Sequence, residues 1–161
     1  MNIGITGATG FIGTALAKAA TERGHGVVAF SRSRNISLPW AKEVRPISEE
    51  GDSAIDPVDL DAVVHLAGES VMGYWTPSKK RRILSSRVDL TRRIVESLKN
   101  CNDRPKTFIS ASGSGAYGNR GDEWLTESSA RGKGFLADVC AAWEAAACRA
   151  MALGVRVVLL R

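Results

Sequence analysis

The chain has 161 residues, of which 44% are hydrophobic and 24% charged, and its formal net charge is +5 at pH 7. This composition is typical of a soluble globular protein with one sizeable core, and no apolar run approaches the roughly 20 residues that span a bilayer. Three cysteines without metal-ligand spacing argue against a disulfide framework or a zinc site. Because Met1 leads directly into an apolar run, we expect no signal peptide and a reducing, cytoplasmic location.

Short apolar runs alternate along the chain with amphipathic stretches of helical length. We expect strands at 2–5, 27–30, 44–47, 61–66, 106–111 and 155–160. We expect helices at about 11–23, 78–100 and from 135 to just before Gly154. The alternation predicts an α/β fold, a doubly wound (Rossmann) parallel sheet of about six strands with helices on both faces. Between the third and fourth strands only a turn at 57–60 is expected in place of a helix.

The positive charge is concentrated in the predicted helix at 78–100, which has eight basic and two acidic side chains. A solvent-exposed helix face explains this pattern, and an anionic ligand or partner is the alternative. No aromatic residues are interleaved with the basic ones, so we do not expect nucleic acid to bind. The apolar stripe expected to face the core is Leu84, Val88, Thr91, Val95 and Leu98.

A glycine-rich turn follows the first predicted strand. Residues 6–13 read TGATGFIG, and the amphipathic helix starts within them. Glycines at this spacing allow a tight turn and a close approach of the backbone to a pyrophosphate, which then meets the helix N-terminus. We therefore expect a dinucleotide to bind at Gly7, Thr9, Gly10, Phe11 and Ile12.

The end of the second predicted strand distinguishes NAD from NADP. Residues 30–34 read FSRSR, with no carboxylate to accept hydrogen bonds from a ribose 2′-hydroxyl. A guanidinium matches the oxygens of a 2′-phosphate. We therefore expect NADP rather than NAD, with Arg32 as the principal contact and Ser31 and Ser33 supporting it. The alternative is that these arginines are merely exposed loop residues.

Small residues follow the fourth and fifth predicted strands, at the sheet edge where ligands bind in open α/β folds. Leu66, Ala67 and Gly68 would line the cofactor path, and Ser110 would lie beside it. His65 is expected to be a hydrogen-bonded strand residue rather than a catalytic base. The segment from Ser112 to Gly118 either contacts the substrate through its hydroxyls or is a loop whose serines cap their own backbone.

Three of these features together resemble the extended short-chain dehydrogenases/reductases of the epimerase/dehydratase group: the glycine pattern, Leu66-Ala67-Gly68, and the serine-rich segment ending in Tyr117-Gly118. Several further segments are similar to the atypical epimerase-family proteins sometimes labelled cell-division-inhibitor-like. They are Leu66–Glu69, Trp75-Thr76, Ser86-Arg87, Thr91-Arg92, Phe135–Cys140, Trp143-Glu144 and Gly154–Arg161. Members of this family are usually nearly twice as long, which implies that residues 1–161 form the dinucleotide-binding domain and that a C-terminal substrate-binding part is absent.

The sequence departs from the superfamily at its Tyr-x-x-x-Lys motif, in which lysine lowers the pKa of a tyrosine that exchanges a proton with substrate. Counted from Glu144, the corresponding positions are Leu136 and Cys140, and the motif occurs nowhere else. The resemblance then leaves Ser112, Ser114 and Tyr117 as candidate replacements, and we take Ser112 and Tyr117 as the candidate catalytic residues.

Two functions are compatible with the sequence. The first is an NADP(H)-dependent oxidoreductase or epimerase acting on a small molecule at a carbon that bears a hydroxyl or carbonyl. The second is a noncatalytic protein that senses NADP(H) and regulates a partner, which the missing dyad favours. The helix at 78–100 is a candidate homodimer contact, as in related enzymes. We expect the residues that recognise the substrate to lie in the absent C-terminal part.

Overall fold

The computed structural model describes residues 1–33 and 36–161, and these build a single six-stranded sheet. Every strand pair is parallel, in the order β3-β2-β1-β4-β5-β6. The strands are β1 (Asn2–Thr6), β2 (Gly26–Ser31), β3 (Glu43–Pro46), β4 (Ala62–His65), β5 (Thr107–Ala111) and β6 (Arg156–Leu160). The order reverses between β1 and β4, where such folds bind their ligands. The predicted doubly wound sheet is confirmed.

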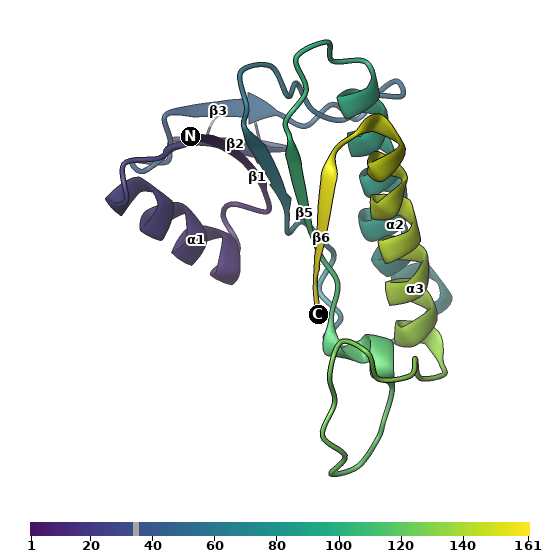
Figure 1. The fold of residues 1–161 in the computed structure, drawn as a ribbon. Helices are drawn as coiled ribbons and strands as arrows, with labels where there is room; N and C mark the ends of the chain where they lie inside the picture. The colour runs from purple at the N-terminus through teal and green to yellow at the C-terminus, as the bar shows by residue number, and fades with distance from the viewer. Residues whose placement is uncertain (34–35) are drawn as a thin grey trace.

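The helices lie on both faces of this sheet (Figure 1). On one side is α1 (Phe11–Glu22), and on the other are α2 (Pro77–Lys99) and α3 (Phe135–Cys148). Two 3-10 turns complete the architecture: η1 (Ser114–Tyr117) and η2 (Arg149–Leu153). Among the described residues, no helix is both long and apolar enough to cross a bilayer.

Alternate residues of the central strands face opposite helical layers. In β2, Val28 and Phe30 pack into the core beneath α2 and α3, whereas Val27 and Ala29 pack beneath α1. Burial on both faces explains why these strands read as continuous apolar runs rather than as alternating ones. The two cores fix β1 and β4 between them, so the carboxyl ends of these strands are held in a defined place.

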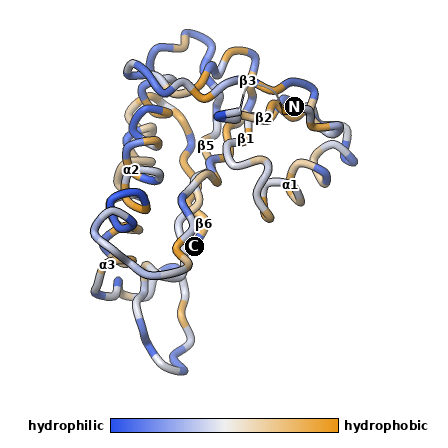
Figure 2. Tube along the Cα trace, turned by 180° about the vertical axis from the view of Figure 1, so that it is seen from behind, coloured by the Kyte–Doolittle hydropathy of each residue, from blue (hydrophilic) through white to orange (hydrophobic). Residues whose placement is uncertain are grey.

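The buried face of α2 differs from the predicted stripe at one position. Leu84 is 40% exposed, and Ile83 is fully buried in its place. One residue step rotates a side chain by about 100° around a helix, so adjacent residues cannot share a narrow face. Figure 2 shows hydrophilic and hydrophobic positions interleaved along α2, as an amphipathic helix requires.

Most basic residues of α2 are exposed, as expected, and three of them, Lys79, Arg87 and Arg93, are partly buried. Lys79 forms an ion pair with Glu69 at 2.8 Å, and Arg87 is only partly exposed. The Arg93 guanidinium donates to four backbone carbonyls of the segment at 48–53. That segment replaces the missing crossover helix, so Arg93 fixes an irregular stretch that has few partners of its own.

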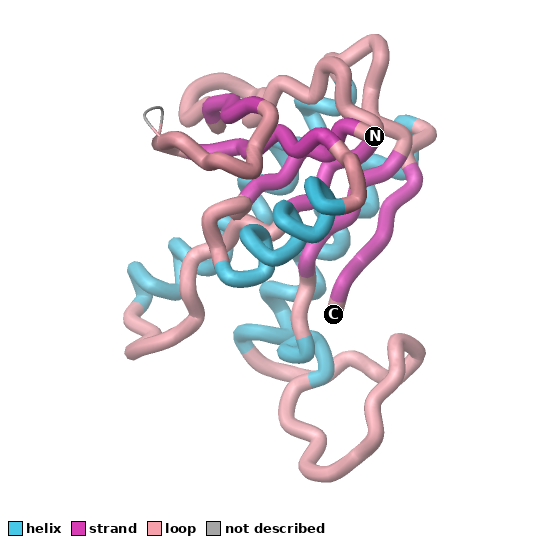
Figure 3. Tube along the Cα trace, turned by 90° about the vertical axis from the view of Figure 1, so that its left-hand side faces the viewer, coloured by secondary structure: helices cyan, strands magenta, loops and turns pink. Residues whose placement is uncertain are grey.

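A long loop joins η1 to α3 and projects beyond the carboxyl edge of the sheet (Figures 1 and 3). It spans 118–134, and Trp124 within it is 95% exposed. Arg120 and Glu123 pair with each other inside the loop at 2.8 Å. The loop therefore borders the edge at which the site residues gather without burying its own aromatic side chain.

Candidate functional site

The glycine turn between β1 and α1 requires glycine at two positions. Gly7 has φ +71°, and a Cβ there would lie 2.8 Å from the Ala67 backbone nitrogen. A Cβ on Gly13 would lie only 2.1 Å from the Gly7 carbonyl oxygen. The first turn of α1 thus packs directly on the backbone of the preceding loop, which no side chain would permit.

The backbone amides at the N-terminus of α1 have no side-chain hydrogen-bond acceptor from the protein itself. Gly10 is the N-cap, and no side chain accepts a hydrogen bond from the first turn. The side chains of Phe11 and Ile12 are 95% and 65% exposed. Unpaired amides and the positive end of the helix dipole form an anion site. Together with the glycine packing, this arrangement fits a pyrophosphate.

A groove of about 690 Å³ runs from this turn across the ends of β2 and β4. Nine of the twelve residues predicted to bind the cofactor line it: Gly7, Thr9, Gly10, Ser31, Arg32, Ser33, Leu66, Ala67 and Gly68. Phe11 and Ile12 begin the adjoining helix. Ser110 differs from the others because it is fully buried and its hydroxyl donates to the Ala111 carbonyl at 3.1 Å.

Polar side chains gather where the groove passes the end of β2. The Ser31 hydroxyl accepts a hydrogen bond from the Ser33 amide at 3.0 Å, which leaves its own proton available to donate. Arg32 is exposed at this end, and the Glu49 carboxylate lines the same groove. Arg34, which belongs to the same predicted basic segment, lies outside the described residues.

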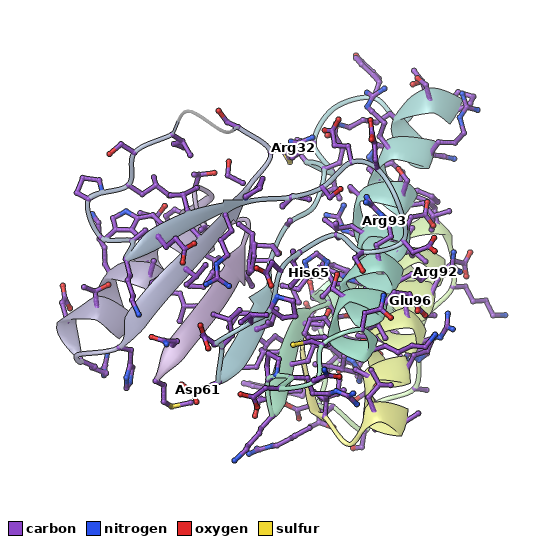
Figure 4. All side chains as sticks on the ribbon, turned by 90° about the horizontal axis from the view of Figure 1, so that it is seen from above. Arg32, Asp61, His65, Arg92, Arg93 and Glu96 are labelled. Atoms are coloured by element: carbon purple, nitrogen blue, oxygen red, sulfur yellow. The ribbon has the colours of Figure 1, made fainter. Side chains whose placement is uncertain are left out.

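His65 lies inside the molecule between the sheet and α2 (Figure 4). It has no exposed surface, and its Nδ1 is 2.6 Å from the Thr6 hydroxyl oxygen. Burial, reinforced by the charge of Arg87, lowers the pKa of His65 from 6.5 to about 3. Because the ring is neutral and sealed from solvent, it is a structural strand residue, as expected, although Nε2 has no partner among the described residues.

The end of β5 holds a polar network around one buried carboxylate. Glu144 on α3 accepts from the Ser112 hydroxyl at 2.6 Å and from Arg161 Nε and Nη2 at 2.8 and 2.9 Å. Arg131 donates to the same carboxylate from the long loop. Arg161 Nη1 also donates to the Tyr117 hydroxyl at 3.2 Å. Both candidate catalytic residues are therefore joined by one network.

Burial of Glu144 by itself would raise the pKa of its carboxyl. Hydrogen bonds from Arg161, Ser112 and Arg131 outweigh this effect and lower the pKa from 4.5 to about 2. The carboxylate is therefore ionised at neutral pH and orients its donors instead of acting as an acid. The Ser112 proton points to Glu144, so the lone pairs of the Ser112 oxygen remain to accept a hydrogen bond.

The positions where the superfamily places its dyad, Leu136 and Cys140, lie on α3 next to η1. A Cβ on Gly115 would be 3.2 Å from Leu136 Cβ and 3.9 Å from Cys140 Sγ. Burial raises the pKa of the Cys140 thiol, and its sulfur lies 3.9 Å from the Gly113 carbonyl oxygen. Leu136 has no ionisable group and the Cys140 thiol is neutral, so neither side chain supplies the cation of the dyad at neutral pH.

Three members of the network, Glu144, Arg131 and Arg161, were not among the residues predicted for the site. Arg131 lies in the long loop and Arg161 follows β6, so each is distant in sequence from Glu144. The available signal was Glu144 itself, an acidic residue next to the buried Trp143 on a mostly apolar helix. A buried carboxylate requires cationic or hydrogen-bonding partners, although the sequence does not say which residues provide them.

Comparison with known proteins agrees with this geometry. The family model of the NAD dependent epimerase/dehydratase family matches residues 3–161. The sequence is 36% identical to the epimerase family protein YfhF of Bacillus subtilis (strain 168), over 100% of this chain and 54% of that protein. It is 33% identical to the chloroplastic SDR39U1 homolog of Arabidopsis thaliana, over 100% of this chain and 48% of that protein. The chain thus spans about half the length of the curated relatives it matches.

A solved structure shows the same arrangement of elements. The crystal structure of human epimerase family protein SDR39U1 (isoform 2) with NADPH superposes with a TM-score of 0.83 at 28% identity, over 100% of this chain and 53% of that one. Since the family model matches almost every residue and the glycine turn, sheet order and groove agree with it, this chain is an NAD(P)-binding Rossmann protein of the NAD dependent epimerase/dehydratase family.

Proposed function

We propose that this chain is the cofactor-binding domain of an NADP(H)-dependent oxidoreductase or epimerase acting on a small molecule with a hydroxyl or carbonyl carbon. The observation that carries the proposal is the groove that joins the uncapped N-terminus of α1 to the exposed Arg32. It supplies amides for a pyrophosphate and a guanidinium for a 2′-phosphate. The relative solved with NADPH supports the choice of cofactor.

Each end of the groove has a defined role in this proposal. Gly7, Thr9 and Gly10 hold the pyrophosphate, while Arg32 and the hydroxyls of Ser31 and Ser33 hold the 2′-phosphate. Leu66, Ala67 and Gly68 form the wall along which the cofactor passes. When bound, the nicotinamide supplies hydride transfer. The protein then needs only to orient the substrate and to exchange one proton.

Ser112 and Tyr117 are the residues that we propose to contact the substrate. The Ser112 oxygen, oriented by Glu144, can accept a hydrogen bond from a substrate hydroxyl. The Tyr117 hydroxyl, which accepts from Arg161, retains its own proton to donate. Proton transfer by a positioned side chain contributes about 10²–10⁴-fold to a rate, so these groups can replace the missing dyad.

One observation favours a second function, that of a noncatalytic NADP(H) sensor. Tyr117 is only 6% exposed, and its hydroxyl is already engaged by the network. A buried, hydrogen-bonded Tyr117 is as compatible with a structural role as with a catalytic one. Ser112→Ala and Tyr117→Phe separate the two functions in the full natural chain, because an enzyme loses turnover while retaining cofactor, whereas a sensor has no turnover to lose.

Titration of NADPH and NADH tests the cofactor assignment. We expect NADPH to bind more tightly, and Arg32→Asp to weaken NADPH by about 10- to 100-fold, the effect of one or two charge-assisted hydrogen bonds. The same variant should leave NADH within about threefold. Arg81→Asp, an exposed change on α2 away from the groove, is the matched control. Equal affinities of the unsubstituted protein for NADPH and NADH would show that Arg32 does not bind the 2′-phosphate.

A further inference from the structure

Gly68, at the wall of the groove, has a guanidinium directly behind it. A Cβ at Gly68 would lie 3.0 Å from Arg87 Cζ, 3.1 Å from Nη2 and 3.2 Å from Nη1. Gly68 itself is exposed and lines the groove, and Arg87 reaches it from α2. The absence of a side chain at Gly68 therefore leaves the guanidinium next to the ligand path.

The Arg87 side chain is held rigidly by contacts on one side only. Its Nη1 donates to the Glu69 carbonyl oxygen at 2.9 Å and to the Ile83 carbonyl oxygen at 3.3 Å. Its Cζ lies 5.2 Å from the centroid of the Trp143 ring, in a cation–π contact. Nε and Nη2 make no hydrogen bond to any of the described residues. The Arg87 guanidinium is thus fixed in place, and its Nε and Nη2 N–H groups remain to donate hydrogen bonds to a ligand.

No carboxylate neutralises this guanidinium within the described part of the chain. Asp89, the nearest acid in sequence, pairs with Arg92 at 3.1 Å. Glu69, whose backbone carbonyl Arg87 contacts, turns its carboxylate to Lys79 at 2.8 Å and Arg82 at 3.5 Å. Burial lowers the pKa of Arg87, although an arginine remains charged at any physiological pH. A partly desolvated charge with unused donors is costly unless something else satisfies them. An acceptor on a ligand would do so.

The strand order shows which half of a dinucleotide passes Arg87. The pyrophosphate turn follows β1, and Arg32 follows the neighbouring β2 on one side. Arg87 lies on the other side, behind the end of β4 and over Trp143, toward β5. If the adenosine half extends toward Arg32, the half that reaches Gly68 is the nicotinamide half. Its ribose has two adjacent hydroxyls, which match two N–H donors of one guanidinium.

We propose that Arg87 binds the nicotinamide-side ribose through the gap left by Gly68, and that it supplies from α2 the cation that the superfamily places on α3. Cys140 occupies the lysine position of α3, one helical turn before Trp143, and the Arg87 guanidinium packs on the Trp143 ring. The proposal rests on the proposed dinucleotide binding, and it assigns a role to Arg87, which the family resemblance includes without giving it one.

The test compares two ligands in the full natural chain. NADPH contains the nicotinamide ribose, whereas 2′,5′-ADP contains only the adenosine half. We expect Arg87→Met to weaken NADPH by about 10- to 100-fold, as the loss of one or two charged hydrogen bonds does. The variant should leave 2′,5′-ADP within about twofold. Arg81→Met, at an exposed position on the same helix, should change neither affinity.

Equal weakening of both ligands would overturn the proposal, because it would show that Arg87 only shapes the groove. Unchanged NADPH affinity would overturn it as well. Failure of the unsubstituted protein to bind either ligand would instead contradict the proposed function itself. If the methionine variant does not fold, Arg87→Gln decides the matter, since its amide can still donate to the Glu69 carbonyl and stack on Trp143.

Discussion

The two ends of the candidate site are built in opposite ways. At β1 and α1, the amides of the first helical turn have no side-chain cap and face a groove. At β5 and β6, Ser112 and Tyr117 are bonded into a network centred on buried Glu144. One end presents donors with no internal acceptor, and the other satisfies its polar groups internally.

This difference separates what each end requires of a ligand. The open end gains hydrogen bonds when an anion arrives, so binding there stabilises the protein by the usual linkage. The polar groups of the closed end already have hydrogen-bond partners. A substrate must therefore compete with Glu144, or it must bind the lone pairs of Ser112 and the proton of Tyr117 that the network does not use. We therefore expect the open end to bind the ligand and the closed end to hold its own residues in fixed positions. Substitutions at the open end should therefore lower the affinity for the ligand, whereas substitutions at the closed end should lower the stability of the protein.

The largest effect is expected at the open end, from Gly13→Ala. Its Cβ would lie 2.1 Å from the Gly7 carbonyl oxygen and 2.8 Å from Ala8 Cα, both backbone atoms, so the turn must move. Because the amides of α1 move with it, affinities for NADPH and 2′,5′-ADP should both fall by at least about 100-fold, with a loss of stability of about 1–3 kcal/mol. Calorimetric titration and urea unfolding measure the two effects.

Gly24→Ala is the matched control at the other end of the same helix. It has φ +78° but nothing within 4 Å of its added Cβ. The strain of a positive φ should cost about 1 kcal/mol of stability and leave affinity unchanged. If Gly13→Ala binds both ligands normally, the close glycine packing is not what forms the phosphate site.

The closed end should respond in stability rather than in affinity. Glu144→Gln leaves Arg161 and Arg131 without their counter-charge, and breaking a buried pair in this way costs about 3 kcal/mol. Binding of 2′,5′-ADP should stay within about twofold. Urea unfolding and titration of the same samples provide both readouts.

An exposed pair supplies the comparison for this variant. Glu123 pairs with Arg120 in the long loop, where both side chains are partly solvated. Glu123→Gln should cost at most about 1 kcal/mol. Equal losses from the two variants would mean that Glu144 contributes no more than a surface carboxylate, and the idea of a rigid closed end would be wrong.

The open end was more accessible to sequence reasoning than the closed end. Gly7, Gly10 and Gly13 are contiguous in sequence, and their spacing already reflects the backbone contacts that the structure shows. The doubly wound parallel sheet followed from the alternation of apolar runs with helical stretches, because parallel connections permit few topologies. The error at Leu84 came from choosing between adjacent apolar residues in α2, for which periodicity alone is ambiguous.

The closed end could not be assembled from local patterns. Glu144 meets Ser112, Arg131 and Arg161, which are separated from it by 32, 13 and 17 residues. Only the packing of α3 against β5 and β6 brings them together. Arg87 was part of the family resemblance, but it received no role for a related reason. It is one of eight basic residues of the same helix, and its contacts with Trp143 and Gly68 join segments that are distant in sequence.

The smallest effect concerns the interior between the two ends, where His65 is sealed. Its pKa is about 3 in the folded protein and 6.5 in the unfolded chain, so between these values only the unfolded state takes up a proton. Stability should therefore fall as pH decreases below 6.5, by about 1 kcal/mol at pH 5.5, and should not change from this cause above 6.5. Glu144 acts only below pH 4.5, because its pKa is 4.5 unfolded and about 2 folded.

The window from pH 7.5 to 5.5 thus isolates the histidine from the carboxylate network. Urea unfolding across it should show the decline in the unsubstituted protein and a flatter profile in His65→Gln, whose side chain does not titrate. Persistence of the full slope in the variant would assign it to another group. Absence of any slope in the unsubstituted protein would mean that water reaches His65, and then the interior beside Arg87 would be open enough to weaken the contrast between the two ends.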